Sequence, residues 1–282
     1  MQVLQTIAQM RAARPGAGDL GLVPTMGYLH AGHLSLVERA KAECGAVAVS
    51  IFVNPTQFGP GEDLSRYPRD LPRDLGMLEA AGVDLVFAPE PSEIYPPGFA
   101  TEIRVGGVTD VLEGAVRPGH FAGVATVVAK LFNIVQPTRA YFGQKDAQQS
   151  VVIRKLVADL DLPVEIVVAP TVREADGLAL SSRNSYLTPE QRAAAPAIFR
   201  ALTAARVLFE GGERDAEAVR QAMRATIAAE PDMRIDYVSV ADPETLRELS
   251  TVDRAALASM AVRLGATRLI DNLLLGGEAA GR

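Results

Sequence analysis

The short string HAGH brings together His30 and His33, two of only three histidines in the chain. It follows the apolar run DLGLVP and precedes a helical pattern, so it falls where a strand of an open α/β sheet ends and a helix begins. There the free amides and dipole of the helix favour an anion, and Gly32 lets the backbone approach it. Imidazoles can donate hydrogen bonds to phosphate oxygens. The string therefore favours charge stabilisation during attack on an α-phosphate.

The same two histidines have simpler interpretations. Histidines near a turn are often solvated or serve as a helix cap, and the string alone does not decide against that. A metal site is less favoured, because no Cys, Asp or Glu lies at helical spacing from either histidine. We predict no metal held by protein ligands alone.

A second loop with suitable chemistry is FGQKDAQQS, residues 142–150, which follows the strand candidate RAYFG and leads into a helix. Gly143 frees the backbone, Lys145 brings a point charge suited to phosphate, and Asp146 can accept from ribose hydroxyls or cap the helix. A plain helix cap would explain Asp146 but not Lys145, one of only four lysines. We therefore expect this loop, like HAGH, to lie at the carboxyl edge of the sheet.

Three further loops carry weaker signals. RPGHFAGVAT places Arg117 beside His120 at a helix entry, which predicts a second anion-facing loop unless His120 is an ordinary surface residue. LALSSRN clusters Ser181, Ser182 and Arg183, groups that can hold a triphosphate, although such a string is common in loops. The long loop FVNPTQFGPGEDLSRYPRD offers amide and cationic partners for a small polar acid, and its alternative is an irregular surface loop.

The elements that must position these loops alternate between short β-branched runs and longer helical patterns from residue 20 to about 170. The predicted strands are DLGLVP, AVAVSIFVN, VDLVFAP, RAYFG and VEIVVAP. Such alternation predicts an α/β fold with an open parallel sheet. After Thr188-Pro189-Glu190, a helix-start signal, two helices (about 189–210 and 215–229) precede the strands RIDYVSVAD, MAVRLG and RLIDNLLL, which predicts a smaller α+β domain. We place the domains at 1–175 and 176–282.

The composition limits the classes of partner that the protein can bind and indicates where it is located. The chain has 282 residues, 48% hydrophobic and 22% charged, with a net charge of −6, so no global basic field attracts nucleic acid. A single cysteine excludes an intrachain disulfide, and no apolar run is long enough for a membrane span. We expect a cytoplasmic protein without a nucleic-acid or membrane partner. The glycine pattern GAGDLG at 16–21 precedes the first strand of the alternating pattern, so it argues against a dinucleotide-binding redox enzyme and is interpreted as a surface turn.

Five motifs in this order resemble the family of pantoate-beta-alanine ligases, the pantothenate synthetases, within the H-x-G-H nucleotidylyltransferase superfamily: PTMGYLHAGH, FVNPTQF, RPGHFAGV, YFGQKDAQQ and TVREADGLALSSRN. The resemblance covers nearly the whole chain, with no motif position broken. It implies that ATP and pantoate give pantoyl adenylate and diphosphate, and that beta-alanine then displaces AMP to give pantothenate. It also implies a Rossmann-like N-terminal domain, a C-terminal lid, Mg2+ accompanying ATP, and a homodimer.

The resemblance also implies roles for individual residues. His30, His33, Lys145 and Arg183 would be catalytic, with His33 as the usual proton donor; Gln57 and Gln149 would bind pantoate, and Gln57 also beta-alanine. The implied ATP site comprises Met26, Gly27, Tyr28, Leu29, His30, Ala31, Gly32, His33, Gly143, Gln144, Lys145, Asp146, Val172, Leu180, Ser181, Ser182 and Arg183. Asn54, Arg117 and His120 would support the substrate pocket.

Three other functions would use similar residues. An enzyme that transfers a whole nucleotide to a phosphorylated acceptor would share the histidines, but its acceptor would need more Arg or Lys than FVNPTQF and Gln149 provide. A silent nucleotide-binding module would bind ATP without turnover and would need no such full set of phosphate-facing groups. An aminoacyl-tRNA synthetase would need a surface for tRNA, which the acidic balance disfavours.

Overall fold

The computed structural model describes residues 1–14 and 18–277. Its N-terminal part contains β1 (Gln2–Leu4), α1 (Ile7–Ala13), β2 (Leu20–Thr25), α2 (Ala31–Glu43), β3 (Ala46–Ile51), η1 (Pro55–Gln57), α3 (Leu71–Ala80), β4 (Leu85–Phe87), α4 (Pro91–Ile94), α5 (Glu113–Val116), α6 (His120–Val135), β5 (Arg139–Gly143), η2 (Gln144–Asp146), α7 (Ala147–Asp159) and β6 (Glu165–Ala169). Then follow η3 (Ser182–Tyr186), α8 (Pro189–Ala194), α9 (Ala197–Glu210), α10 (Ala216–Ala228), β7 (Met233–Ala241), β8 (Ala256–Leu264) and β9 (Thr267–Leu275).

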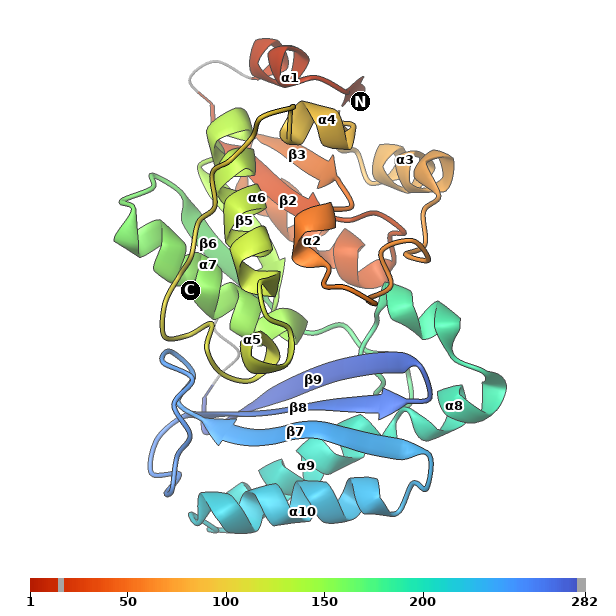
Figure 1. The fold of residues 1–282 in the computed structure, drawn as a ribbon, viewed down its shortest axis with the longest axis vertical. Helices are drawn as coiled ribbons and strands as arrows, with labels where there is room; N and C mark the ends of the chain where they lie inside the picture. Colours follow the sequence, from red (N-terminus) through yellow and green to blue (C-terminus); the bar gives the residue numbers. More distant parts are fainter. Residues whose placement is uncertain (15–17, 278–282) are drawn as a thin grey trace.

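The six N-terminal strands form one parallel sheet in the order β1-β4-β3-β2-β5-β6. Its central strands are short, continuous apolar runs because both faces are covered. Alternate side chains of each strand enter two different cores, one shared with α1, α6 and α7 and the other with α2 and α3. Figure 1 shows the sheet between these helices. The predicted α/β class and all five predicted strands are confirmed.

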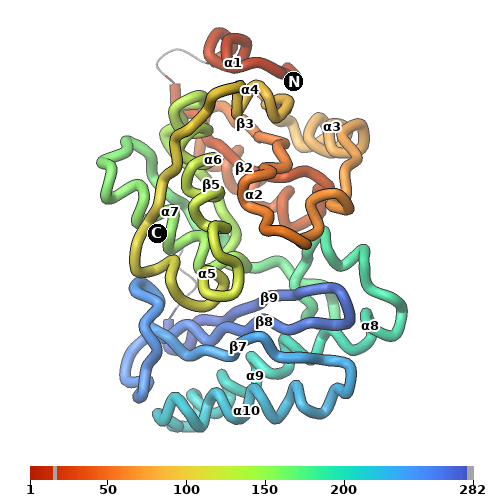
Figure 2. Tube along the Cα trace, in the orientation of Figure 1, coloured from red at the N-terminus to blue at the C-terminus, as the bar shows by residue number. Residues whose placement is uncertain are grey.

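The C-terminal part is a three-stranded antiparallel sheet, β7-β8-β9, packed against α9 and α10. Along β8, Ala258, Met260 and Val262 enter the core shared with these helices, whereas Leu257 packs into the N-terminal core on the opposite face. Figures 1 and 2 show this sheet lying against the end of the N-terminal domain. The predicted α+β character is therefore confirmed.

Two details differ from the sequence-based expectations. The predicted helix 189–210 is two helices, because α8 ends at Ala194 and α9 begins at Ala197, with Pro196 between them lacking the N–H that a continuous helix needs. The edge strand β1, only three residues long, was not predicted. Part of the predicted surface turn at 16–21 lies outside the described residues. Among the residues that the structure describes, no helix is long and apolar enough to cross a membrane.

Candidate active site

Two loops that the sequence predicted to lie at the carboxyl edge of the sheet follow the adjacent parallel strands β2 and β5. We call residues 27–33 the histidine turn and residues 143–146 the lysine turn. Parallel neighbours end at the same edge of a sheet, so both turns lie at its carboxyl edge. Lys145 lies near enough to lower the pKa of both His30 and His33 by its charge. Both loops are therefore at the predicted edge, and the fold makes them neighbours.

The histidine turn is organised by a reciprocal cap at the start of α2. The backbone N–H of Gly32 donates to His30 Nδ1 (3.1 Å), and the N–H of His30 donates to His33 Nδ1 (3.2 Å). The two rings lie against each other with centroids 4.0 Å apart. A β carbon at Gly32 would lie 3.0 Å from the His30 ring, so a larger residue would have to displace that ring slightly. Because both Nδ1 atoms accept, each neutral ring carries its hydrogen on Nε2, which remains available as a donor.

Both imidazoles are neutral in the free protein at pH 7. Burial, with the charge of Lys145 as a further cause, lowers the pKa of His30 to about 4. Burial, His30 and Lys145 together lower the pKa of His33 to about 3. The turn therefore offers hydrogen-bond donors, and its positive charge comes from Lys145.

The approach to the histidines is held by helix α3. Gly27 and Tyr28 have positive φ angles, 82° and 51°, which bend the chain after β2. The buried carboxylate of Asp74 accepts from the N–H groups of Tyr28 (2.7 Å) and Leu29 (2.8 Å). Arg73 donates to the carbonyl of Leu29 (3.0 Å). Neither α3 residue was predicted to serve the site.

The glutamine predicted to bind the acid substrate, Gln57, is oriented by Asn54. The side-chain amide of Asn54, which is 1% exposed, donates to Gln57 Oε1 (3.0 Å) and to the carbonyl of Gly123 (3.1 Å). Gln57 Nε2 in turn donates to the sulfur of Met26 (3.2 Å). With Oε1 already accepting, Gln57 can present its amide hydrogens to a ligand oxygen.

Arg117 and His120 do not form the free anion-facing loop that we expected. Arg117 makes a two-pronged ion pair with Glu62, 2.7 Å at both contacts. His120 Nδ1 donates to the carbonyl of Gln57 (2.8 Å), and its Nε2 accepts from Arg117 (3.1 Å). Burial and Arg117 lower the pKa of His120 to about 4, so it is neutral. The pair supports the Gln57 loop, and the charge of Arg117 is already balanced.

The segment containing Leu180 to Arg183 lies against the histidine turn. Ser182 Oγ donates to the carbonyl of Tyr28 (3.2 Å), and Leu180 donates its N–H to the carbonyl of Val172 (3.0 Å). Ser181 caps η3 by accepting from the N–H of Arg183 (3.2 Å).

Arg183 is already paired in this structure. Its Nε and Nη2 contact the carboxylate of Asp63 at 2.8 and 2.9 Å. The guanidinium also lies over the ring of Tyr67. A phosphate contact by Arg183 would therefore fall to Nη1 or require release from Asp63.

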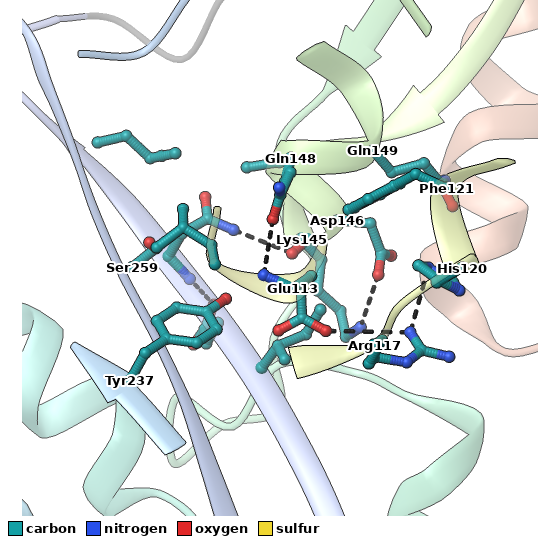
Figure 3. Close-up of a pocket in the computed structure, with 16 residues that line it drawn as sticks. Glu113, Arg117, His120, Phe121, Lys145, Asp146, Gln148, Gln149, Tyr237 and Ser259 are labelled. Atoms are coloured by element: carbon teal, nitrogen blue, oxygen red, sulfur yellow. Dashed lines mark hydrogen bonds and ion pairs between the residues drawn. The ribbon is translucent and has the colours of Figure 1, made fainter. Parts of the chain in front are cut away.

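Gln149 lines a cavity between the two domains, together with Lys145, Asp146, Arg117 and residues of the C-terminal sheet. Figure 3 shows Gln149 at one side of this cavity and the ion pair between Lys145 and Asp146 within it. The neighbouring Gln148 is buried and structural, since it accepts from the N–H of Glu113 (2.9 Å) and donates to two carbonyls of the preceding loop. Of the two adjacent glutamines, only Gln149 has its side chain free for a ligand, among the contacts of the described residues.

An open parallel sheet with neutral imidazole donors and a lysine at adjoining strand ends defines a nucleotide-using α/β enzyme of the H-x-G-H class. A family model described as pantoate-beta-alanine ligase matches residues 2–274. The chain belongs to this family.

Curated relatives and solved structures agree with that assignment. A pantothenate synthetase from Herpetosiphon aurantiacus is 65% identical over 276 residues, covering 98% of this chain and all of the relative. The crystal structure of the pantothenate synthetase from Thermus thermophilus superimposes with a TM-score of 0.94 at 57% identity, covering 97% of this chain and 99% of that one. The pantoate-beta-alanine ligase from Francisella tularensis, solved in complex with beta-gamma ATP and beta-alanine, has a TM-score of 0.80 at 36% identity and covers 97% of each chain.

Proposed function

We propose that the two turns carry out the ATP-dependent condensation of pantoate with beta-alanine to give pantothenate, AMP and diphosphate. The observation that carries this conclusion is the pair of neutral histidines beside Lys145 at the adjoining ends of β2 and β5. The ligase family of the chain supports the same reaction. The pantoyl adenylate formed in between stays bound to the enzyme.

In the first step a carboxylate oxygen of pantoate attacks the α-phosphorus of ATP, and the bond to the bridging oxygen of diphosphate breaks. Pantoate is ionised at neutral pH, so this step needs no strong base. Fixed donors must instead meet charge that gathers on the α-phosphate and on the leaving diphosphate. We assign the Nε2–H groups of His30 and His33 to the α-phosphate oxygens, and Lys145 to the triphosphate.

His33 enters this step as a hydrogen-bond donor. A group whose pKa is about 3 is not protonated at neutral pH, so the free enzyme holds no imidazolium there. An anionic phosphate beside the ring would raise that pKa. The proton-donor role that the family resemblance implies for His33 thus depends on bound nucleotide.

The remaining nucleotide contacts come from three segments. We assign the contact with the ribose to Asp146, and backbone contacts with the adenosine to Gly143 and Gln144. Val172 and Leu180–Arg183 would make further contacts with the nucleotide. Met26 to Ala31 would complete the wall beside the histidines. Support for this grouping comes from the hydrogen bonds that tie Ser182 to Tyr28 and Leu180 to Val172.

We assign the acid substrates to Gln57 and Gln149. The amide hydrogens of Gln57, oriented by Asn54, suit the hydroxyl and carboxylate oxygens of pantoate and of beta-alanine. In the second step the neutral amine of beta-alanine attacks the acyl carbon of the adenylate. The bond from that carbon to the phosphate oxygen breaks, and AMP and a proton are released.

Mg2+ would accompany ATP. The described residues contain no group of three His, Cys, Asp or Glu side chains that could cage a metal, which fits an ion held mainly by substrate phosphates. Bound there, the ion would neutralise phosphate charge. The chain's own contribution remains the donors of the two turns.

Three properties of the whole molecule are also proposals. We propose that residues 176–282 close over the adenylate as a lid that excludes water, that the enzyme is a homodimer, and that it acts in the cytoplasm. Support for the lid comes from the cavity between the two parts of the chain, which is lined by Lys145 and Gln149 on one side and by residues of the C-terminal sheet on the other. Mobility at 175–188 that ATP leaves unchanged would contradict closure, and sedimentation of the purified chain tests the dimer.

The decisive test is isotope exchange between diphosphate and ATP, with Mg2+ and purified protein, before beta-alanine is added. Exchange that requires pantoate supports a reversible acyl adenylate, and beta-alanine should then release AMP. Turnover with a phosphomonoester but no exchange with pantoate would contradict the proposal and indicate nucleotide transfer instead.

A further inference from the structure

The local side-chain anchor of the lysine turn in the described residues is a long one, since Ser150 Oγ donates to the carbonyl of Asp146 at 3.5 Å. Neither η2 nor α7, which follow each other at residues 144–159, has a side-chain hydrogen bond at its N-cap. The ion pair from Lys145 to Asp146, 3.5 Å long, lies within the turn and does not connect it to a neighbouring element. A further anchor for the backbone of the turn comes from a distant part of the chain.

That anchor is Asn272 in strand β9 of the C-terminal sheet. Its side-chain nitrogen donates to the carbonyls of Gln144 and Lys145, both at 2.9 Å. Its side-chain oxygen accepts from Gln144 Nε2 (3.0 Å). Asn272 is 3% exposed, so these bonds are made in a desolvated place.

Asn272 is itself fixed by its neighbour on β9. The buried carboxylate of Asp271 accepts from the N–H of Asn272 (2.8 Å) and makes a two-pronged ion pair with Arg173, at 2.5 and 2.9 Å. Arg173 is next to Val172, so the same two residues of β9 contact both the lysine turn and the segment proposed to complete the nucleotide site. Two consecutive residues of the C-terminal sheet thus hold two loops of the N-terminal domain.

We infer that Asn272 is a positioning residue for the ATP-dependent step, which it serves by fixing the backbone of Lys145. This inference rests on the proposed role of Lys145. A primary amide provides two donors and an acceptor in one plane, which matches two consecutive carbonyls and one side-chain amide. Aspartate has nearly the same shape but no donor, so it would set a carboxylate against both carbonyls.

The experiment compares diphosphate–ATP exchange in the full-length enzyme and in Asn272→Ala, Asn272→Ser and Asn272→Asp. We expect Asn272→Ala to lower the maximal exchange rate about 10- to 100-fold while the KM for pantoate changes less than about twofold. Asn272→Asp should lose at least as much, despite its shape, and Asn272→Ser, which keeps one donor, should lose less. The matched control is Ser239→Ala, which removes a buried hydroxyl without a hydrogen-bond partner among the described residues. We expect its exchange rate to match the original chain.

A double variant separates positioning from general destabilisation. If Asn272 acts through Lys145, then adding Asn272→Ala to Lys145→Ala should cost little further rate, whereas a purely structural loss would multiply with the first. An unchanged rate in Asn272→Ala, or fully multiplicative losses, would overturn the inference while a low rate in Lys145→Ala still upheld the proposed function. An unchanged rate in Lys145→Ala would overturn the role of Lys145 and the inference with it.

Discussion

The histidine turn and the lysine turn lie side by side, yet they are held in opposite ways. In the histidine turn the ring nitrogens of His30 and His33 accept from backbone groups at most three residues away. In the lysine turn the backbone is gripped by Asn272, which is 127 and 128 residues distant in the chain. The first turn is thus largely built by its own sequence, and the second exists in its observed form only when the C-terminal sheet is docked.

This difference has a consequence for function. An enzyme that joins two substrates in sequence benefits when one side of its active site is always formed and the other side forms only when a second domain is in place. The proposed donors for the α-phosphate are preorganised in the histidine turn, whereas the backbone of Lys145 accepts a hydrogen bond from β9 of the C-terminal sheet. Docking of the C-terminal sheet and assembly of the phosphate site are therefore coupled.

The largest expected loss of activity comes from changes at the phosphate-facing residues of the two turns. We expect His33→Ala to lower the maximal rate of diphosphate–ATP exchange by about 10² to 10³, since a donor to the developing charge is lost. Lys145→Ala should lower it by a similar factor. Both variants should retain the far-ultraviolet circular dichroism of the original chain.

The matched variant is His33→Asn, whose side-chain oxygen can still accept from the N–H of His30 but which has no donor in place of Nε2–H. It should lose as much exchange as His33→Ala while keeping the cap. Recovery of most of the rate in His33→Asn would mean that the ring serves the turn and not the phosphate.

A fall in pH should lower the free energy of unfolding through the histidines, most of which lie in the histidine turn. All three histidines have native pKa values of about 4 or 3, below their unfolded value of 6.5, so the unfolded chain binds more protons. The free energy of unfolding should therefore fall as pH falls from 7 to 5, by on the order of 1 kcal/mol per histidine after allowance for solvent screening.

Urea titrations at the two pH values test this expectation. The double variant His30→Asn/His33→Asn should lose about two thirds of the pH dependence, and His120→Asn, which keeps a donor for the carbonyl of Gln57, about one third. Carboxylates of ordinary pKa contribute little above pH 5, whereas burial raises the pKa of Asp74 and Asp271, which acts in the opposite direction to the histidines. An undiminished slope in the double variant would show that the two rings are not neutral in the native state.

Among the distant supports of the histidine turn, Asp74 accepts two hydrogen bonds and gives the next effect. Asp74→Asn replaces a carboxylate that accepts from two N–H groups by an amide that can accept from one, leaving a buried donor unpaired. We expect this to cost about 1 to 3 kcal/mol of unfolding free energy and about tenfold in exchange rate. Asp70→Asn is the control at the start of the same helix, because Asn also caps a helix well and residue 70 is only half-buried. Equal losses in the two variants would contradict a specific role for Asp74.

The contrast between the turns also explains what the sequence could and could not predict. Apolar runs and helical spacing predict the sheet, and the residues after each strand end predict both turns, because these signals are local. Asp74, Asp63 and Asn272 were missed, since their partners are distant in sequence and only the fold brings them together. Faint signals existed: Asp74 has the helical spacing of buried Leu78, and Asp271 and Asn272 interrupt an apolar strand.

The same limit applies to charge balance. Arg117 and Arg183 were interpreted as free cations, because a sequence shows a guanidinium but not the carboxylate beside it. Glu62 and Asp63, two consecutive residues of the polar loop after η1, pair with these two arginines. The loop that suggested recognition of an acid thus also supplies the counter-charges of the site.

The smallest effect separates the two kinds of contact that Asn272 makes. Gln144→Ala removes the bond from the Gln144 side chain to Asn272 but leaves both backbone carbonyls gripped, since a carbonyl is present whatever the side chain. A single neutral hydrogen bond contributes about 0.5 to 1.5 kcal/mol, and the two remaining bonds should hold Lys145. We therefore expect the exchange rate to fall no more than about threefold, with the KM for ATP little changed. A loss as large as that of Asn272→Ala would mean that Asn272 acts through the Gln144 side chain, and the backbone of the lysine turn would then not need the C-terminal sheet.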